Sequence, residues 1–260
     1  MMMTRPADIA GLLRFYAEAG VDTAVLDTPA NLLSPRAMAE PAPVRPAAPA
    51  LPATPVAIPD DQQIGRAREA ARSAATLDDL RSALDAFDGC NLKFTARRLV
   101  FGDGNPAAAL MLVGEAPGGD EDREGLPFVG RSGKLLDRML AAIGIDRTSC
   151  YIANTVPWRP PGNRTPTPLE TEICRPFLER QIELVGPKVL VALGAPATKA
   201  LTGATEGIMR LRGGWRTCTT RSGAAIPVMP TLHPAYLLRS PAHKKLAWRD
   251  LLEVKAKLNG

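Results

Sequence analysis

The stretch Ala-Ala-Leu-Met-Leu-Val-Gly-Glu-Ala-Pro-Gly, residues 108–118, decides the fold of this chain. Its first six residues are apolar, which is typical of a strand that is buried on both faces of a parallel sheet. The Gly-Glu-Ala-Pro-Gly that follows predicts a tight turn from this strand into a helix. It is not a dinucleotide-binding fingerprint, because the G-x-G-x-x-G spacing is absent.

The same alternation of a short apolar run with a helical pattern continues along the chain. Further strands are predicted at 151–156, 189–193 and 226–229. Helices are predicted at 62–75, after a cap at Thr76, at 132–143, at 168–185, in a short segment ending at Leu201, and at 241–258. Strands alternating with helices indicate an α/β fold in which a parallel sheet of about four strands is covered on both faces.

Residues 61–260 are therefore expected to form the main domain. Before them, residues 8–18 place apolar side chains at helical spacing, which predicts a short helix within an appendage at 1–33. Residues 34–60 interleave prolines with alanine and valine, a composition typical of a stiff, extended linker. The appendage is either a docking element for a protein partner or a weakly packed decoration, and the sequence leaves both open.

Bulk composition sets loose bounds on function. The chain has 32 Lys and Arg against 27 Asp and Glu, a net charge of +5 that suits a polyanionic partner but is weak support for one. No apolar run is long enough to cross a membrane, and no signal peptide is recognisable. The four cysteines show no close pairing, which favours a reducing compartment. We expect a cytoplasmic, monomeric protein.

Three of the four predicted strands end in residues that core packing does not call for. The first runs into Glu115, the second ends at Asn154, and the fourth is followed by His233 and Arg239. Ligands of parallel sheets bind beyond the carboxyl ends of the strands, so these side chains predict a site at one rim. Taken singly, each has a plainer reading: Asn154 as a turn former, His233 as a helix cap or buried histidine, and Arg239 as part of a solvated face.

Five ordered motifs point to a known family. They are Gly-Glu-Ala-Pro-Gly at 114–118, Gly-Leu-Pro-Phe-Val-Gly-Arg-Ser-Gly at 125–133, Tyr-Ile-Ala-Asn at 151–154, Arg-Pro-Pro-Gly-Asn-Arg at 159–164 and His-Pro-Ala-Tyr-Leu-Leu-Arg at 233–239. With these motifs, residues 85–255 resemble the family 4 uracil-DNA glycosylases. The resemblance implies a compact three-layer α/β/α sandwich with DNA lying across the carboxyl-end rim of the sheet.

The resemblance also implies an activity: base-excision repair in which uracil is flipped out of DNA and its N-glycosidic bond is hydrolysed, leaving an abasic site. Uracil-containing DNA would then be the partner, and the protein would be associated with the nucleoid. Two alternatives stay open. One is a glycosylase for a broader range of deaminated bases, and the other is a binder of uracil or abasic DNA without turnover.

Several residues match the family's uracil pocket. Phe128 matches the aromatic that stacks on the flipped ring, and the Pro127 and Gly130 around it suggest an exposed loop. Asn154 matches the residue that reads the uracil edge, and His233 the residue that contacts O2. Glu115 either orients the attacking water and stabilises the cationic sugar, or fences the C5 edge against thymine. Further pocket positions are Gly114, Ala116 and Gly118; because Ala116 stands where the superfamily often has aspartate, an aspartate-activated water is not expected.

Other matches concern DNA. Leu237 sits where a leucine wedge would enter the gap left by the flipped base, or else it packs the loop. Arg159, Arg164 and Arg239 are predicted phosphate contacts, and Ser132 begins a helix whose amides could hold another phosphate.

The chain departs from the family at a four-iron cluster that is usually held by four cysteines. Cys90 and Cys174 match two ligands, but Phe87 and Trp158 stand at the other two positions. Cys150 precedes Trp158 by eight residues, about 26 Å along an extended strand, so it is not expected to substitute. We therefore predict no metal and no cofactor, with the two aromatic rings filling the space; a retained [4Fe-4S] cluster is the alternative.

Overall fold

The computed structural model of the chain describes residues 60–260. The predicted helix at 8–18, the appendage at 1–33 and the linker up to residue 59 lie outside the described residues.

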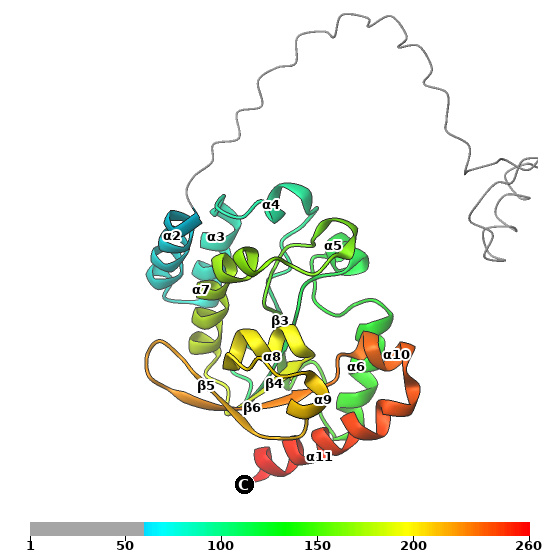
Figure 1. Cartoon of the computed structure of the whole chain (residues 1–260). Helices are drawn as coiled ribbons and strands as arrows, with labels where there is room; N and C mark the ends of the chain where they lie inside the picture. The colour runs from blue at the N-terminus through cyan, green and yellow to red at the C-terminus, as the bar shows by residue number, and fades with distance from the viewer. Residues whose placement is uncertain (1–59) are drawn as a thin grey trace, which may run out of the picture. The chain divides into compact units, whose positions relative to one another are not determined.

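A six-stranded sheet forms the centre of the domain, with the strand order β1-β3-β2-β4-β6-β5 (Figure 1). The four inner strands are parallel and are the four that the sequence predicts. Two antiparallel edge strands, β1 and β5, are additional. The strands are β1 (Asp103–Gly104), β2 (Leu110–Gly114), β3 (Cys150–Asn154), β4 (Val189–Leu193), β5 (Arg216–Thr219) and β6 (Ala225–Thr231). The predicted α/β class is confirmed.

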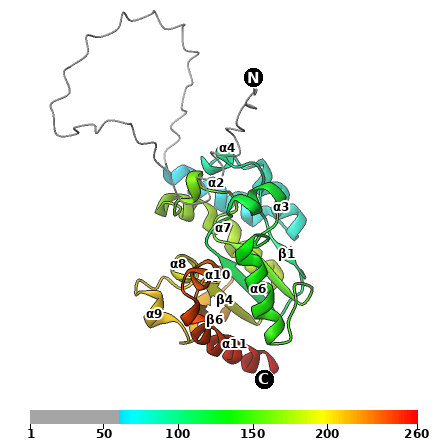
Figure 2. The same ribbon diagram turned by 90° about the vertical axis from the view of Figure 1, so that its right-hand side faces the viewer.

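Alternate residues of the buried strands point to opposite faces, and each face carries two long helices. Met111 and Val113 pack with α7 (Pro168–Val185) and α8 (Ala195–Thr202) on one face. Leu110 and Leu112 pack on the other face with α6 (Arg131–Ala142) and α11 (Lys244–Asn259) (Figure 2). The result is the predicted three-layer sandwich, in which each strand is buried on both sides.

Two further helices pack against α7 away from the sheet. These are α2 (Asp60–Ser73) and α3 (Leu77–Ala86), and together with α7 they enclose a separate apolar cluster around Trp158. Thr76 caps α3 through a reciprocal pair of bonds with Asp79, as its position before the apolar run predicts.

The short helices were not predicted, because four to six residues are too few to show a helical period. They are α4 (Leu92–Thr95), α5 (Gly119–Glu124), α9 (Ile208–Leu211), α10 (Pro234–Arg239) and the 3-10 turns at Pro161–Asn163 and Pro241–His243. The second of these turns replaces the start of the helix predicted at 241–258. None of the helices within residues 60–260 is long and apolar enough to cross a membrane.

The strand order positions the site. From β2 the chain crosses to β3 on one side, and then returns to β4 on the other side of β2. Such a reversal leaves a crevice at the carboxyl ends of the two central strands, where parallel sheets bind their ligands. Glu115 and Gly194 are the residues that directly follow these two strands.

Candidate active site

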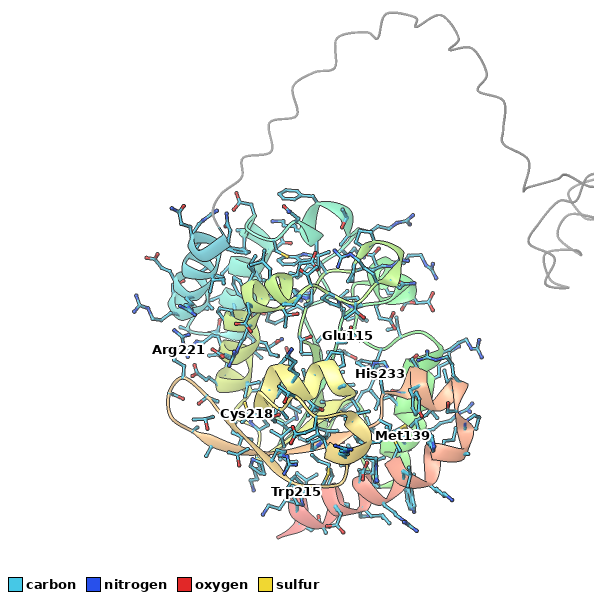
Figure 3. All side chains as sticks on the ribbon, in the orientation of Figure 1. Glu115, Met139, Trp215, Cys218, Arg221 and His233 are labelled. Atoms are coloured by element: carbon cyan, nitrogen blue, oxygen red, sulfur yellow. The ribbon has the colours of Figure 1, made fainter. Side chains whose placement is uncertain are left out.

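A cavity of about 210 Å³ lies at this rim and gathers the predicted pocket residues. Glu115 follows β2, Asn154 ends β3 and His233 follows β6, and all three line the cavity with Phe128. Figure 3 shows Glu115 and His233 close together at the centre of the domain. Other predicted residues that line the same cavity are Ala116, Gly118, Ser132 and Arg164.

The turn after β2 is stapled to the turn after β3. The amide of Thr155 donates to the carbonyl of Gly114 at 2.9 Å, and the amide of Val156 donates to the carbonyl of Glu115 at 3.1 Å. The Thr155 hydroxyl adds a second bond to the Glu115 carbonyl at 2.5 Å. The backbone beneath the carboxylate and the neighbouring amide is thus held from both strands.

The carboxyl group of Glu115 is only partly satisfied. Its Oε1 atom is buried and has no hydrogen-bond partner within the described residues. Burial raises the pKa of Glu115 above its usual value, and a hydrogen bond from Thr165 offsets part of that rise. An acceptor that is buried without a donor is costly, so this atom is suited to a bond from a bound water or ligand.

Gly114 leaves the space in which Asn154 and Phe128 face the cavity. A Cβ atom at Gly114 would lie 2.4 Å from the Asn154 Oδ1 atom and 2.7 Å from the Phe128 ring. Both contacts are far inside van der Waals distance, so a side chain here would displace the two residues that the base would touch. Asn154 is itself only 6% exposed, and its amide is therefore held away from bulk water.

Phe128 lies on a loop as expected, but it is buried rather than exposed, with 5% of its surface accessible. Its backbone has a φ of 55°, in the left-handed region that few non-glycine residues adopt. The Arg147 guanidinium holds this conformation by donating to the Phe128 carbonyl and, at 3.1 Å, to the Pro127 carbonyl. Gly133 allows the approach, because a Cβ there would lie 1.6 Å from the Phe128 oxygen.

Glu121 is a site residue that the sequence did not single out. Its Oε2 accepts from the Gly118 amide at 3.0 Å, and its Oε1 accepts from the amides of Val129 and Gly130 at 3.2 Å each. It joins the turn after β2 to the Phe128 loop. The acidic run at 120–122 was visible in the sequence, but nothing in it shows which of the three carboxylates turns inward.

His233 is both a helix cap and a pocket residue, so its two readings hold together. As the N-cap of α10, its Nδ1 accepts from the Ala235 amide at 3.1 Å. Its ring lies 5.5 Å from the Phe128 ring, centroid to centroid. Burial, aided by the nearby Arg239 charge, lowers the pKa of His233 to about 4. The imidazole is therefore neutral near pH 7, and because Nδ1 accepts, the proton is on Nε2.

The three predicted phosphate-binding arginines differ in their freedom. Arg164 forms a two-point pair with Glu170 at 2.8 and 2.6 Å. Arg159 donates to Asn163 at 2.8 Å and lies 3.8 Å from the buried Asp122 carboxylate. Within the described residues, Arg239 is exposed and has no carboxylate partner.

Leu237 does not occupy the position predicted for a wedge. Its side chain is 0% exposed and packs with Leu232 and Ala247 beneath α10. The motif forms a helix rather than an open loop, and the helix turns Leu237 inward. The predicted wedge is therefore wrong for this structure, and the packing reading is correct.

The end of β4 was overlooked in the sequence. Gly194 has a φ of 96°, and a Cβ there would lie 3.2 Å from the His233 Cβ. It borders a second, mainly apolar cavity of about 240 Å³ that shares Glu115 and His233 with the first. The signal was a glycine directly after an apolar strand, the same pattern that Gly114 shows.

The residues at the expected cluster position do not form a cluster site. Cys90 and Cys174 contact each other, and the Cys174 thiol bond to Cys90, with burial, raises the pKa of Cys174 well above its usual value. Phe87 and Trp158 share their apolar cluster. Cys150 and Cys218 are buried in two other clusters of the core. A donor set of two thiols and two aromatic rings does not fit a four-iron cluster, which needs four ligands.

Comparisons with known proteins agree with this geometry. Residues 101–252 match the model of the Uracil DNA glycosylase superfamily. A type-4 uracil-DNA glycosylase of Thermotoga maritima is 40% identical over 173 residues, 64% of this chain and 86% of the relative. The type-4 uracil-DNA glycosylases of Archaeoglobus fulgidus and Saccharolobus solfataricus are both 41% identical, over 64% and 65% of this chain and 85% and 81% of their own lengths.

Proposed function

Because this chain belongs to the uracil-DNA glycosylase superfamily, we propose that it excises uracil from DNA by hydrolysing the N-glycosidic bond, as the initial step of base-excision repair. The observation that carries this function is the single cavity that brings Glu115, Phe128, Asn154 and His233 together. These are the four side chains that the resemblance assigns to an extruded uracil, and they come from four separate segments of the chain.

Recognition of the base rests on Phe128 and Asn154. The ring of Phe128 offers a stacking surface, and such a contact contributes about 1–3 kcal/mol per base. The Asn154 amide accepts from uracil N3–H and donates to O4. Cytosine presents the opposite pattern, so it would leave buried polar groups unpaired at a cost of roughly 1–3 kcal/mol each. Gly114 keeps the space for both contacts open.

Bond cleavage rests on His233. As the bond breaks, its electron pair goes to the uracil ring and the sugar becomes cationic. The neutral imidazole donates from Nε2 to O2, and this bond strengthens as negative charge develops there. Water then adds to the sugar carbon, and its proton is released as the hydroxyl forms. The Ala235 amide fixes the tautomer, so the donor is in place before the reaction begins.

For Glu115 we propose the water-orienting role rather than the fence. Its support is the Oε1 atom, a buried acceptor with no donor among residues 60–260. A fence would need only the bulk of the side chain, whereas a water molecule between Glu115 and the sugar satisfies this atom. The ionised carboxylate also faces the positive charge that develops on the sugar.

We further propose that the protein has no iron–sulfur cluster. The support is the donor set: Cys90 and Cys174 face Phe87 and Trp158, and all four are in one packed cluster. The aromatic pair then provides apolar packing where metal would otherwise join the segments. A cytoplasmic, nucleoid-associated monomer remains our proposal for its state, supported by four unpaired buried cysteines. A partner for the segment at 1–33 remains a proposal from its sequence.

One experiment separates the three candidate activities. Oligonucleotides carrying uracil, thymine, hypoxanthine or xanthine at one position are incubated with the protein and then treated with alkali, which cleaves at abasic sites. Cleavage at uracil alone is the expected result. Cleavage at hypoxanthine or xanthine would favour the broader glycosylase. A gel shift of uracil DNA without cleavage would overturn the proposal in favour of a binding protein.

A further inference from the structure

Phe94 is exposed although the helix that carries it is anchored. Its side chain is 69% accessible, the highest value among the large apolar side chains of residues 60–260. The neighbouring Leu92 of α4 is 1% exposed and packs in the same apolar cluster as Phe87 and Trp158. In both views α4 lies at the opposite end of the domain from α11 (Figures 1 and 2). An exposed ring on a fixed helix contributes nothing to the core.

Cations accompany this ring. Arg97 and Arg98 follow α4, and both are exposed without an ion pair in the described part of the chain. The Arg98 side chain lies against Gly125, where a Cβ would be 3.4 Å from its Cδ atom. Leu126, the next residue, is 39% exposed. Phe94, Arg97, Arg98 and Leu126 are called the α4 patch below.

The α4 patch is joined to the rim of the active site through one buried carboxylate. Asp122 of α5 accepts from the amides of Arg97 and Arg98 at 2.7 and 3.4 Å. Its other oxygen lies 3.8 Å from Arg159, which donates to Asn163 at the edge of the cavity. The patch and the rim are therefore held as one continuous surface.

We propose that the α4 patch binds the DNA strand that continues from the flipped uracil, with Phe94 stacking on an unpaired base and the two arginines contacting phosphates. This rests on the proposed function, which supplies the strand. Unpaired cations beside an exposed aromatic ring are the combination that single strands select, because phosphates are anionic and every base has a face for stacking. A stacked base must be unpaired, so the patch favours single-stranded substrate over duplex.

The test uses the full chain and single-stranded oligonucleotides with uracil in the centre, near the 5′ end, near the 3′ end, or in a short strand without flanks. Phe94→Ala should weaken binding about five-fold to a hundredfold for strands with a long flank on one side only. It should leave the single-turnover rate at saturation, and binding of the short strand, unchanged. Phe94→Trp should restore affinity, and Leu252→Ala, which removes another exposed apolar side chain on α11, should have no effect.

Two measurements make the inference independent of turnover. Replacing Arg97 and Arg98 together by alanine should flatten the salt dependence of binding by about 0.7 per phosphate contact. Binding of uracil-free single strands should also weaken with Phe94→Ala. Equal affinity of Phe94→Ala and the parent for every strand would overturn the inference while excision continued. A chain that excised no uracil would instead refute the proposed function.

Discussion

The Ala235 amide donates to the Nδ1 atom of His233 across 3.1 Å, and this bond lies at the base of the chemistry. It caps α10, fixes the tautomer of the imidazole and leaves the Nε2 proton for the ligand. The helix cap and the reactive donor are thus two atoms of one ring. A pKa of about 4 keeps this arrangement neutral under ordinary conditions.

The first prediction concerns stability and pH. Burial lowers the pKa of His233 to about 4 from 6.5, so between these values the unfolded chain binds more protons than the folded chain. Stability is therefore fully present above pH 6.5 and falls as the pH drops toward 4, by roughly 3 kcal/mol from this residue. Urea unfolding at pH 7 and pH 5 measures the loss.

A matched pair of variants checks the assignment. His233→Asn keeps an N-cap acceptor for α10 and should lose this part of the pH dependence. His243→Asn, which removes the second histidine, should retain it. If both variants kept the dependence of the parent, another group would be responsible.

Arg147→Ala tests the loop that presents Phe128. A residue with positive φ costs of order 1–3 kcal/mol and persists only where its surroundings hold it. Without the bonds to Pro127 and Phe128, the loop should relax, and KM for uracil DNA should rise about tenfold with a smaller change in kcat. Arg175→Ala, which breaks ion pairs on the surface of α7, is the control and should leave KM unchanged. An unaltered KM in Arg147→Ala would contradict this role.

Glu115→Gln separates water positioning from exclusion of thymine. With the carboxylate as acceptor, the glutamine variant should lose about a hundredfold or more in single-turnover rate while still binding uracil DNA. The raised pKa of Glu115 places the acidic decline of the parent's rate above the usual range for glutamate, and the variant should lack that decline. Full uracil excision together with new cleavage at thymine would show that the residue is a fence instead.

Iron content tests the metal-free cluster. Protein purified without oxygen should contain no stoichiometric iron and no visible absorption from iron–sulfur charge transfer. Trp158→Cys with Phe87→Cys restores the four expected ligand positions, so this double variant is the positive control for cluster assembly during expression. Several irons per chain in the parent would refute the proposal.

The sequence predicted the parts of the fold that repeat a clear pattern. The four parallel strands are short apolar runs, and α7 was placed correctly because Thr167 and Gly186 mark its ends. β1 and β5 escaped because one has two residues and the other alternates at an exposed edge. The Phe128 loop looked exposed because the sequence does not reveal Arg147 folding it inward.

The same distinction applies to the site. Glu115, Asn154 and His233 were predictable because they follow buried strands whose carboxyl ends meet. Leu237 was misplaced because the turn after β6 becomes helical, and a helix alternates its faces differently from an open loop. Glu121 escaped because its role depends on three backbone amides that are distant in sequence from any recognisable cap.

The reading of uracil by Asn154 is tested most directly by single-turnover excision of matched uracil and cytosine oligonucleotides, comparing the parent with Asn154→Asp. We predict that the parent cleaves only at uracil. The variant should lose most uracil excision and gain measurable excision of cytosine, since a carboxyl group accepts from the cytosine amine. Uracil excision by Asn154→Asp at the parent's rate would contradict the account, because the base would then be read elsewhere.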